Sequence, residues 1–175
     1  RLALDVNNTI RTDSVILTTM ADLLAHQDLS DLSDPEVLEI LRSFNLDKSF
    51  IGDLELLLPN GCVLRRSGSW YDASNVIDFE EERTKGAYVS DRSKCPFETG
   101  GYVMRNAVPV VQNGETAAML YGVINLQETS RIYKAEAYDG HAFILLIDGN
   151  TGDILLDTWH KELGNVADLG GRKAL

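Results

Sequence analysis

The sequence is poor in the residues on which metal, redox and nucleic-acid chemistry depend. Only three histidines and two cysteines occur among 175 residues, and no His-x-x-x-His or Cys-x-x-Cys spacing is present. No metal site and no cofactor are therefore predicted. Lysine and arginine together number 16 against 27 acidic residues, which gives a net charge of -11. Such a balance disfavours nucleic acid and anionic membrane surfaces as partners, because phosphate contacts require a basic face.

Long apolar runs and catalytic motifs are also missing. The longest uninterrupted apolar stretch, 142–147, is far shorter than the roughly 20 residues that span a bilayer. Gly-x-Ser-x-Gly, a phosphate loop and a dinucleotide fingerprint do not occur, so the residues predict no enzyme class. Because the chain begins with the pattern of a helix interior, we expect a transmembrane helix before Arg1 and another well after Leu175 in the intact protein. Cys62 and Cys95 permit one disulfide, and two free thiols fit equally well.

The first part of the chain has helical periodicity. Apolar residues at helical spacing predict a long amphipathic helix from Arg1 to about His26; they are Val6, Ile10, Leu17, Met20 and Leu24. A second helix is expected to begin at Asp34, a good N-cap followed by proline, and to end at Asn45.

From Phe50 the pattern changes to that of strands. A hairpin is predicted at 54–64 around Pro59-Asn60-Gly61, then a polar loop at 67–85 with one short helix near 75–83, and a short strand at 87–89. Two longer strands, 101–111 and 117–126, form a second hairpin whose turn contains Asn113-Gly114, and Pro109 is expected at an edge or a bulge. This order predicts an α+β fold, an antiparallel sheet with helices on one side.

The remaining chain repeats the opening of this pattern. Residues 128–138 can form a helix, and 142–156 read as strand, glycine turn and strand, like 54–64. We interpret residues 142–156 as the first hairpin of a second, incomplete module. The alternative is that this hairpin completes the first sheet. The predicted organisation is therefore an N-terminal helical region at 1–50, a module at 51–128, and a linker helix with the opening hairpin of a second module at 129–175.

An ordered set of short motifs in the chain resembles the Cache family of bacterial sensor domains. The motifs are Pro59-Asn60-Gly61, Tyr88-Val89-Ser90-Asp91-Arg92, and Val108-Pro109-Val110 followed by Gly114 and Tyr121-Gly122-Val123-Ile124. The likeness covers Phe50–Leu126, and the tail from Ile147 to His160 looks like the start of the second module in double-Cache sensors, especially those of diguanylate cyclases with GGDEF domains.

The resemblance implies a PAS-like α+β fold on the extracytoplasmic face of a cell membrane. Its ligand would be a small polar molecule such as an amino acid, an amine or an organic acid. The chain itself is not expected to be an enzyme, and the output would come from a diguanylate cyclase or histidine kinase domain elsewhere in the parent protein. Two alternatives stay open: an extracellular hydrolase that uses Asp91 and one of Glu80–Glu82, and a structural relay that binds no ligand.

The candidate ligand-binding residues follow the first hairpin. Asp91, beside Tyr88 and Arg92, can pair with a ligand ammonium, although a role in a turn explains it too. Amino-acid-binding members of the family hold the ligand carboxylate with an arginine, a tryptophan and a tyrosine close together. Here Gly68 stands where that arginine would be, so the resemblance does not carry over amino-acid specificity. Arg66 or Arg92 is expected to hold a carboxylate if the ligand is a zwitterion, and Trp70, Tyr71 and Tyr102 are the aromatic residues of the expected site.

Two further predictions concern charged residues and assembly. Glu80–Glu82 is interpreted as the solvated face of a helix. The long helix at 2–24 is expected to pair with its copy in a homodimer, unless its one apolar stripe packs entirely on the sheet.

Overall fold

The computed structural model describes residues 2–30, 34–95, 101–132, 143–158 and 163–169. It contains two compact units. The first unit consists of Arg1–Asp91 and Arg105–Ile124, and the second of Arg92–Met104 and Asn125–Leu175. Each unit is described separately below.

The sheet is antiparallel, with the strand order β3-β2-β1-β7-β6-β4. The strands are β1 (Asp53–Leu57), β2 (Cys62–Arg65), β3 (Trp70–Asp72), β4 (Tyr88–Val89), β6 (Tyr102–Gln112) and β7 (Glu115–Asn125). Both predicted hairpins are confirmed. The turn between β6 and β7 has positive φ angles of 53° at Asn113 and 83° at Gly114, the backbone that a two-residue hairpin turn requires.

Pro109 lies at the edge of the sheet, as the sequence predicts. On one side β6 pairs with β4 at Asn106 and Ala107, and beyond Ala107 no described strand pairs with β6 on that side. A proline without an N–H donor is tolerated at such a position.

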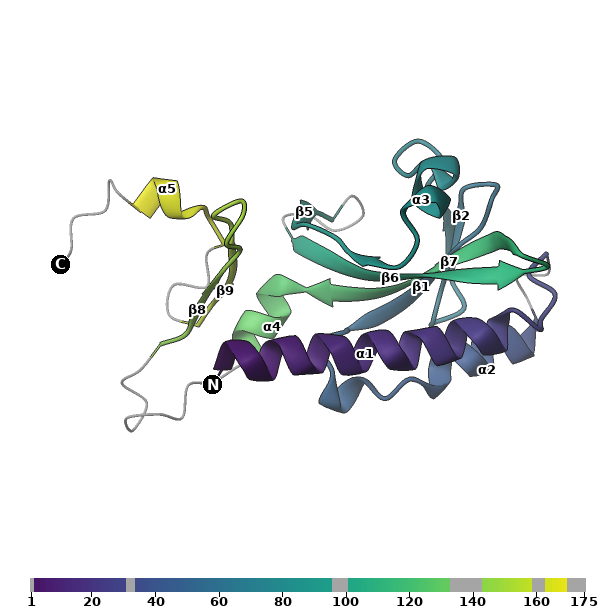
Figure 1. Ribbon diagram of the computed structural model, residues 1–175, viewed down its shortest axis with the longest axis horizontal. Helices are drawn as coiled ribbons and strands as arrows, with labels where there is room; N and C mark the ends of the chain where they lie inside the picture. Colours follow the sequence, from purple (N-terminus) through teal and green to yellow (C-terminus); the bar gives the residue numbers. More distant parts are fainter. Residues whose placement is uncertain (1, 31–33, 96–100, 133–142, 159–162, 170–175) are drawn as a thin grey trace. The chain divides into compact units, whose positions relative to one another are not determined.

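Two helices, α1 (Leu2–Leu24) and α2 (Pro35–Ser43), cover one face of the sheet (Figure 1). On the side that faces the sheet, α1 contributes four buried apolar residues to the core: Leu17, Met20, Ala21 and Leu24. Gly122 on β7 permits this close approach, because a Cβ there would lie 2.3 Å from Ile51 Cδ1 and 3.1 Å from Leu17 Cδ1.

The capping of α2 is partly as predicted. The Asp34 side chain accepts a hydrogen bond from the backbone N–H of Glu36, which confirms the N-cap. The helix ends at Ser43 with Phe44 as its C-cap, however, and Asn45 instead caps the short 3-10 helix η1 (Leu46–Lys48) by accepting from the N–H of Asp47.

The segment 67–85 differs from its prediction in two ways. Residues 70–72 form the edge strand β3 rather than a loop, because they complete the backbone hydrogen bonds of β2. The helix is α3 (Phe79–Lys85), capped by Asp78, and it lies on the face of the sheet opposite to α1 (Figure 1). The prediction of helices on one side only is therefore wrong.

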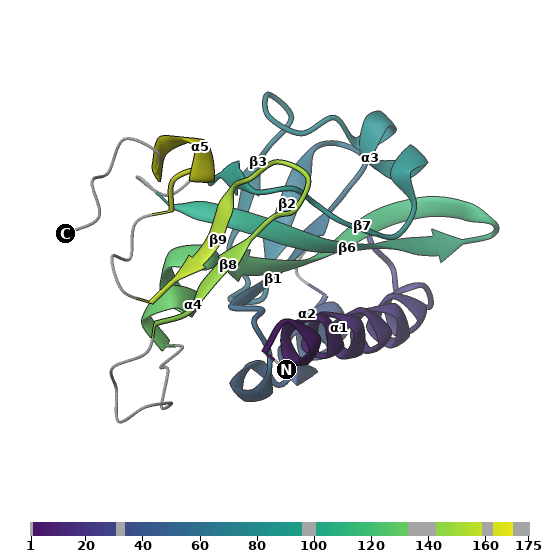
Figure 2. The same ribbon diagram turned by 60° about the vertical axis from the view of Figure 1, so that its left-hand side comes forward.

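The second unit contains a separate two-stranded sheet, formed by β8 (Leu145–Ile147) and β9 (Ile154–Asp157), and the helices α4 (Leu126–Ile132) and α5 (Val166–Leu169) (Figure 2). The alternative that this hairpin completes the first sheet is wrong. In addition, β5 (Ser93–Lys94) pairs with the first residues of β6. The predicted helix at 128–138 is present up to Ile132, and 133–138 lie outside the described residues.

Two observations complete the description. Cys62 and Cys95 are both free thiols. Among the helices that the structure describes, none is long and apolar enough to cross a membrane.

Candidate functional site

The face of the sheet that carries α3 gathers charged and phenolic side chains. Side chains alternate between the two faces of a strand, and five polar ones from β1, β2, β3, β6 and β7 share this face with residues of α3 and β4. We call this set the α3-face cluster. Its members are Glu55, Arg65, Tyr71, Glu82, Lys85, Tyr88, Arg105 and Tyr121. All of them belong to the first unit.

Glu82 is one of two buried carboxylates in the cluster and is only 9% exposed. It accepts hydrogen bonds from the hydroxyls of Tyr88 and Tyr121 and from Lys85 Nζ, the last at 2.7 Å. Burial alone would raise its pKa, but these hydrogen bonds together outweigh burial and lower the pKa below its usual value. Burial and the Glu82 carboxylate raise the pKa of both tyrosines, so both hydroxyls stay protonated donors.

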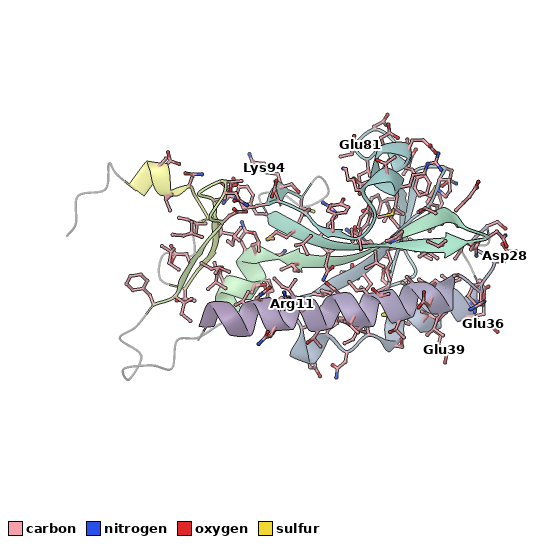
Figure 3. All side chains as sticks on the ribbon, viewed as in Figure 1. Arg11, Asp28, Glu36, Glu39, Glu81 and Lys94 are labelled. Carbon is pink, nitrogen blue, oxygen red and sulfur yellow. The ribbon has the colours of Figure 1, made fainter. Side chains whose placement is uncertain are left out.

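The prediction that Glu80–Glu82 is a solvated helix face is therefore wrong in part. Glu80 and Glu81 are exposed, and Figure 3 shows Glu81 projecting outward from α3. Glu82 points the other way because α3 packs against the sheet through Phe79 and Glu82, three positions apart on one side of the helix.

Glu55 is the second buried carboxylate, at 4% exposure between Leu54 and Leu56 in β1. The Tyr71 hydroxyl donates to its Oε1 at 3.1 Å, and Arg65 Nε lies 3.4 Å from the same oxygen. Burial raises the pKa of Glu55, and the nearby charges of Arg105 and Arg65 partly oppose this shift. Tyr71 in turn has a raised pKa, first because it is buried and second because Glu55 is negative.

Arg105 has an unused hydrogen-bond donor. Its guanidinium carbon lies 5.9 Å from the centroid of the Tyr121 ring, and its Nε is buried without a hydrogen-bond partner in the described part of the chain. Glu82 already accepts three hydrogen bonds, and Glu55 already contacts Tyr71 and Arg65. A buried arginine donor left over in such a cluster can receive an oxygen acceptor from a bound molecule.

Of the predicted site residues, the structure brings Tyr71 and Tyr88 together in the cluster. Trp70, the neighbour of Tyr71, pairs with Leu64 across the sheet and so projects to the opposite face, where it is 60% exposed. Asp91 follows the end of β4 and is exposed, and its carboxylate makes no hydrogen bond or ion pair with a described residue.

The predicted carboxylate-binding arginine Arg66 is engaged elsewhere in the first unit. Its Nη2 donates to the carbonyl oxygen of Arg42 at 2.9 Å, and Arg42 donates back to the carbonyls of Arg66 and Ser67. This reciprocal contact ties the carboxyl end of α2 to the loop between β2 and β3.

Arg92 and Tyr102 lie in the second unit. Nη1 of Arg92 donates to the carbonyl oxygens of Ile154, Leu163 and Gly164, and Nη2 donates to Asp153 Oδ1 at 2.9 Å. The guanidinium carbon is 4.2 Å from the centroid of the Tyr102 ring. These contacts fasten the β8–β9 hairpin and the segment after it.

Sequence reasoning missed Glu55, Arg105 and Tyr121. One signal was available for Glu55, since a single carboxylate interrupts the run Leu54 to Leu58 and must find donors if the strand is buried. Arg105 and Tyr121 could not be associated from sequence, because the cluster depends on strand register and on the position of α3.

The described chain also has a hollow outside this cluster, and its potential metal ligands are not gathered into a site. A hollow of about 280 Å³ in the first unit is lined by Pro59, Asn60, Gly61, Ser74, Ile77, Asp78, Phe79 and Glu80. None of them is a predicted ligand-binding residue, and Glu80 is a candidate in the hydrolase alternative alone. Within the described ranges, no group of three histidine, cysteine or acidic side chains is arranged to hold a metal ion.

Neither a protein-family model nor a curated protein matches this chain. Solved structures do. The ligand-binding domain of the Pseudomonas aeruginosa amino-acid chemoreceptor PctB in complex with L-Gln has a TM-score of 0.68 at 19% identity, covering 97% of this chain and 70% of that one. That of the chemoreceptor PctC with GABA has a TM-score of 0.68 at 17% identity, covering 99% and 80%.

The sensory domain of a Campylobacter jejuni chemoreceptor with isoleucine bound has a TM-score of 0.60 at 16% identity, covering 89% of this chain and 65% of that one. This chain thus spans between 65% and 80% of the length of these three domains. At such identities the likeness concerns the fold, and it confirms the predicted fold class: a mixed α+β fold with a long N-terminal helix and an antiparallel sheet.

Proposed function

We propose that the chain is the extracytoplasmic small-molecule-sensing domain of a membrane-bound bacterial signalling protein, and that its ligand site is the α3-face cluster. The observation that carries the proposal is a buried polar cluster on one face of a sensor-type sheet, with an arginine donor, Arg105 Nε, left without a hydrogen-bond partner in the described chain. A buried polar group without a partner is costly, and a bound ligand relieves that cost.

The ligand class follows from the charges. Glu55 and Glu82 are already neutralised by cluster members, so a ligand carboxylate or other oxygen acceptor would be received by Arg105. Asp91, with no described partner, is the proposed acceptor for a ligand ammonium, and Tyr71 and Tyr88 are the proposed aromatic wall. A small zwitterion or amine fits this arrangement, and the chemoreceptor domains of the same fold were solved with L-Gln, GABA and isoleucine.

The enzyme alternative lacks comparable support. A hydrolase would need a carboxyl group with a raised pKa as general acid. Of the carboxyls that this alternative names, Glu82 has its pKa lowered, and Glu80 is paired with Arg83 at 2.6 Å on the surface. Glu55, whose pKa is raised by burial, already contacts Tyr71 and Arg65. For the parent protein, a GGDEF-type diguanylate cyclase output is part of the proposal and rests on the sequence motifs alone.

A thermal-shift screen against amino acids, amines and carboxylates tests the sensing function. A compound present at 100 times its Kd stabilises the native state by about 2.7 kcal/mol. We expect Arg105→Gln to weaken binding of the best compound roughly tenfold or more, as for loss of a charge-assisted hydrogen bond. Arg83→Gln, which removes an exposed arginine of α3, is the control and should leave affinity unchanged. If no compound in the three classes shifts the melting temperature, the sensing proposal fails and the structural relay is preferred.

A homodimer through α1 is also proposed. Three apolar side chains of α1 stay exposed although its other stripe is buried: Val15 at 67%, Ile16 at 42% and Leu23 at 50%. They lie on one side of the helix, and a matching side of a second copy would bury them. Sedimentation at high concentration should show a dimer for the wild type and a monomer for Val15→Glu. A monomeric wild type contradicts the proposal.

A further inference from the structure

Helix α1 is attached to the sheet in two chemically different ways along its length. Its second half is held by apolar packing, since Leu17, Met20, Ala21 and Leu24 are buried. In the first half, from Val6 to Ser14, the buried contacts of described side chains are largely polar. Hydrogen bonds are directional and can be exchanged one for another, whereas close packing resists small shifts. The first half is therefore the part of α1 that can change position at low cost.

The polar contact to the sheet is made by Asn106 on β6. Asn106 is 2% exposed and faces α1. Its Nδ2 donates to the carbonyl oxygen of Ile10 at 3.3 Å and to Ser14 Oγ at 2.9 Å, and its Oδ1 lies 3.1 Å from the same hydroxyl. These hydrogen bonds give the first half of α1 a directional contact to β6, of the kind that a small shift can exchange.

A second polar contact lies one residue away on the helix. Asp13 is buried, and its Oδ2 accepts a hydrogen bond from Ser49 Oγ at 2.7 Å. Ser49 Oγ in turn accepts from the backbone N–H of Ile51. The first half of α1 is thus tied to β6 and to the segment that leads into β1.

Arg105 and Asn106 are consecutive residues on β6 with side chains on opposite faces of the sheet. Arg105 belongs to the α3-face cluster, and Asn106 holds α1. The backbone of Arg105 is fixed to the neighbouring strand end by two hydrogen bonds: Ser90 N donates to Arg105 O at 2.8 Å, and Arg105 N donates to Ser90 Oγ at 2.8 Å. Ser90 precedes Asp91, so a molecule bound by Asp91 and Arg105 would act on the end of β4 and on β6, the strand that carries Asn106.

We propose that Asn106 couples the α3-face cluster to the first half of α1, so that occupation of the cluster changes how α1 is held at Ile10 and Ser14. This proposal rests on the proposed function, because the cluster is taken as the ligand site. Asn106 is a positioning residue: it touches the helix and not the ligand. A change at Arg105 on one face of the sheet then changes the contacts of Asn106 on the other face. The ligand site and the α1 contact are in this way energetically coupled.

The competing account makes Asn106 a satisfied buried amide with no connection to the cluster. The two accounts differ in what a change on the α3 face does to α1. Residues on opposite faces without shared partners normally behave independently, whereas coupled ones do not.

Native-state hydrogen exchange of the full chain tests the coupling without any ligand. We expect Arg105→Gln to speed exchange of the helix amides at 10–14 about threefold to tenfold relative to those at 20–24, although position 105 lies on the other face. In an Asn106→Leu background, the same change at 105 should add less than about 1.5-fold at those amides. The matched control is Arg83→Gln, which removes an arginine of α3 that lies outside the cluster and bonds Glu80, and it should leave the ratio unchanged.

The proposal is overturned if Arg105→Gln leaves the amides at 10–14 unchanged, or changes them equally with and without Asn106. If Asn106→Leu does not fold, Ser14→Ala replaces it, since alanine keeps the helix and removes only the hydroxyl that Asn106 contacts. Failure of the compound screen would remove the sensing function and leave this exchange result intact, so the two failures are distinguishable.

Discussion

Replacement of Arg92 should release the β8–β9 hairpin. Arg92 donates to four oxygens of the second unit: three backbone carbonyls and Asp153 Oδ1, all within 3.1 Å. Asp153 also accepts from Asn165 Nδ2, so the arginine and the asparagine hold the same carboxylate. Arg92→Met keeps much of the apolar stem but leaves the three carbonyls and the carboxylate without their cationic donor.

The expected loss is several kcal/mol. A hydrogen bond to a charged group contributes about 1.5–3 kcal/mol, and removal of one partner from a buried ion pair costs about 3–5 kcal/mol. The four contacts share one guanidinium, so the energies of the four hydrogen bonds cannot be summed. The cost of about 3–5 kcal/mol for loss of one partner of a buried ion pair is therefore the better guide. Because two-stranded hairpins are only marginally stable by themselves, a loss of this size should open the hairpin about a hundredfold to a few thousandfold more often.

Hydrogen exchange provides the assay. In Arg92→Met the amides of β8 and β9 should lose protection, while β1 and β7 of the first unit keep theirs. Arg92→Lys should fall between, since an ammonium can donate to some of the carbonyls but cannot reproduce the planar arrangement of donors. Arg83→Met is the control, as Arg83 bonds Glu80 on the exposed side of α3. Unchanged protection of β9 in Arg92→Met would refute the reasoning.

Three further predictions concern buried positions. Gly122→Ala should destabilise the fold by about 1–3 kcal/mol in urea titration, because its Cβ would meet Ile51 Cδ1 at 2.3 Å. Glu82 has a lowered pKa, so wild-type stability should fall as the pH falls below the ordinary glutamate value, and Glu82→Gln should lack this part of the pH dependence. Asp13 has a pKa raised by burial, so its contribution is lost as the pH rises above the ordinary aspartate value, and Asp13→Asn should gain stability relative to wild type over that rise. Equal pH profiles of each variant and the wild type would contradict the last two.

The hairpins could be predicted from sequence because their cause is local. Asn113-Gly114 and Pro59-Asn60-Gly61 carry turn chemistry that few other backbones accommodate, and Gly61 has a φ of 81°. The start of α2 was equally local, since Asp34 caps the helix with its own side chain. Such signals act within four residues and need no tertiary partner.

The parts that could not be predicted depend on distant partners. Residues 70–72 have no strand signal of their own and become β3 only because β2 offers unpaired backbone groups beside them. The side of the sheet on which α3 lies, and with it the burial of Glu82, depends on packing by Phe79 on a core formed from Leu57, Ala107 and Met119. No window of sequence contains that information.

The same distinction explains why the aromatic pair was misleading as a description of the site. Trp70 and Tyr71 are neighbours in sequence, and in a loop both could face one ligand. Within β3 they cannot, because successive side chains of a strand point to opposite faces. Tyr71 instead shares its face with Tyr88 and Tyr121, which come from β4 and β7. The aromatic wall of the proposed site is therefore assembled across the sheet rather than along the chain. Its specificity should follow from strand register and from Arg105, more than from the motif that first drew attention to this region.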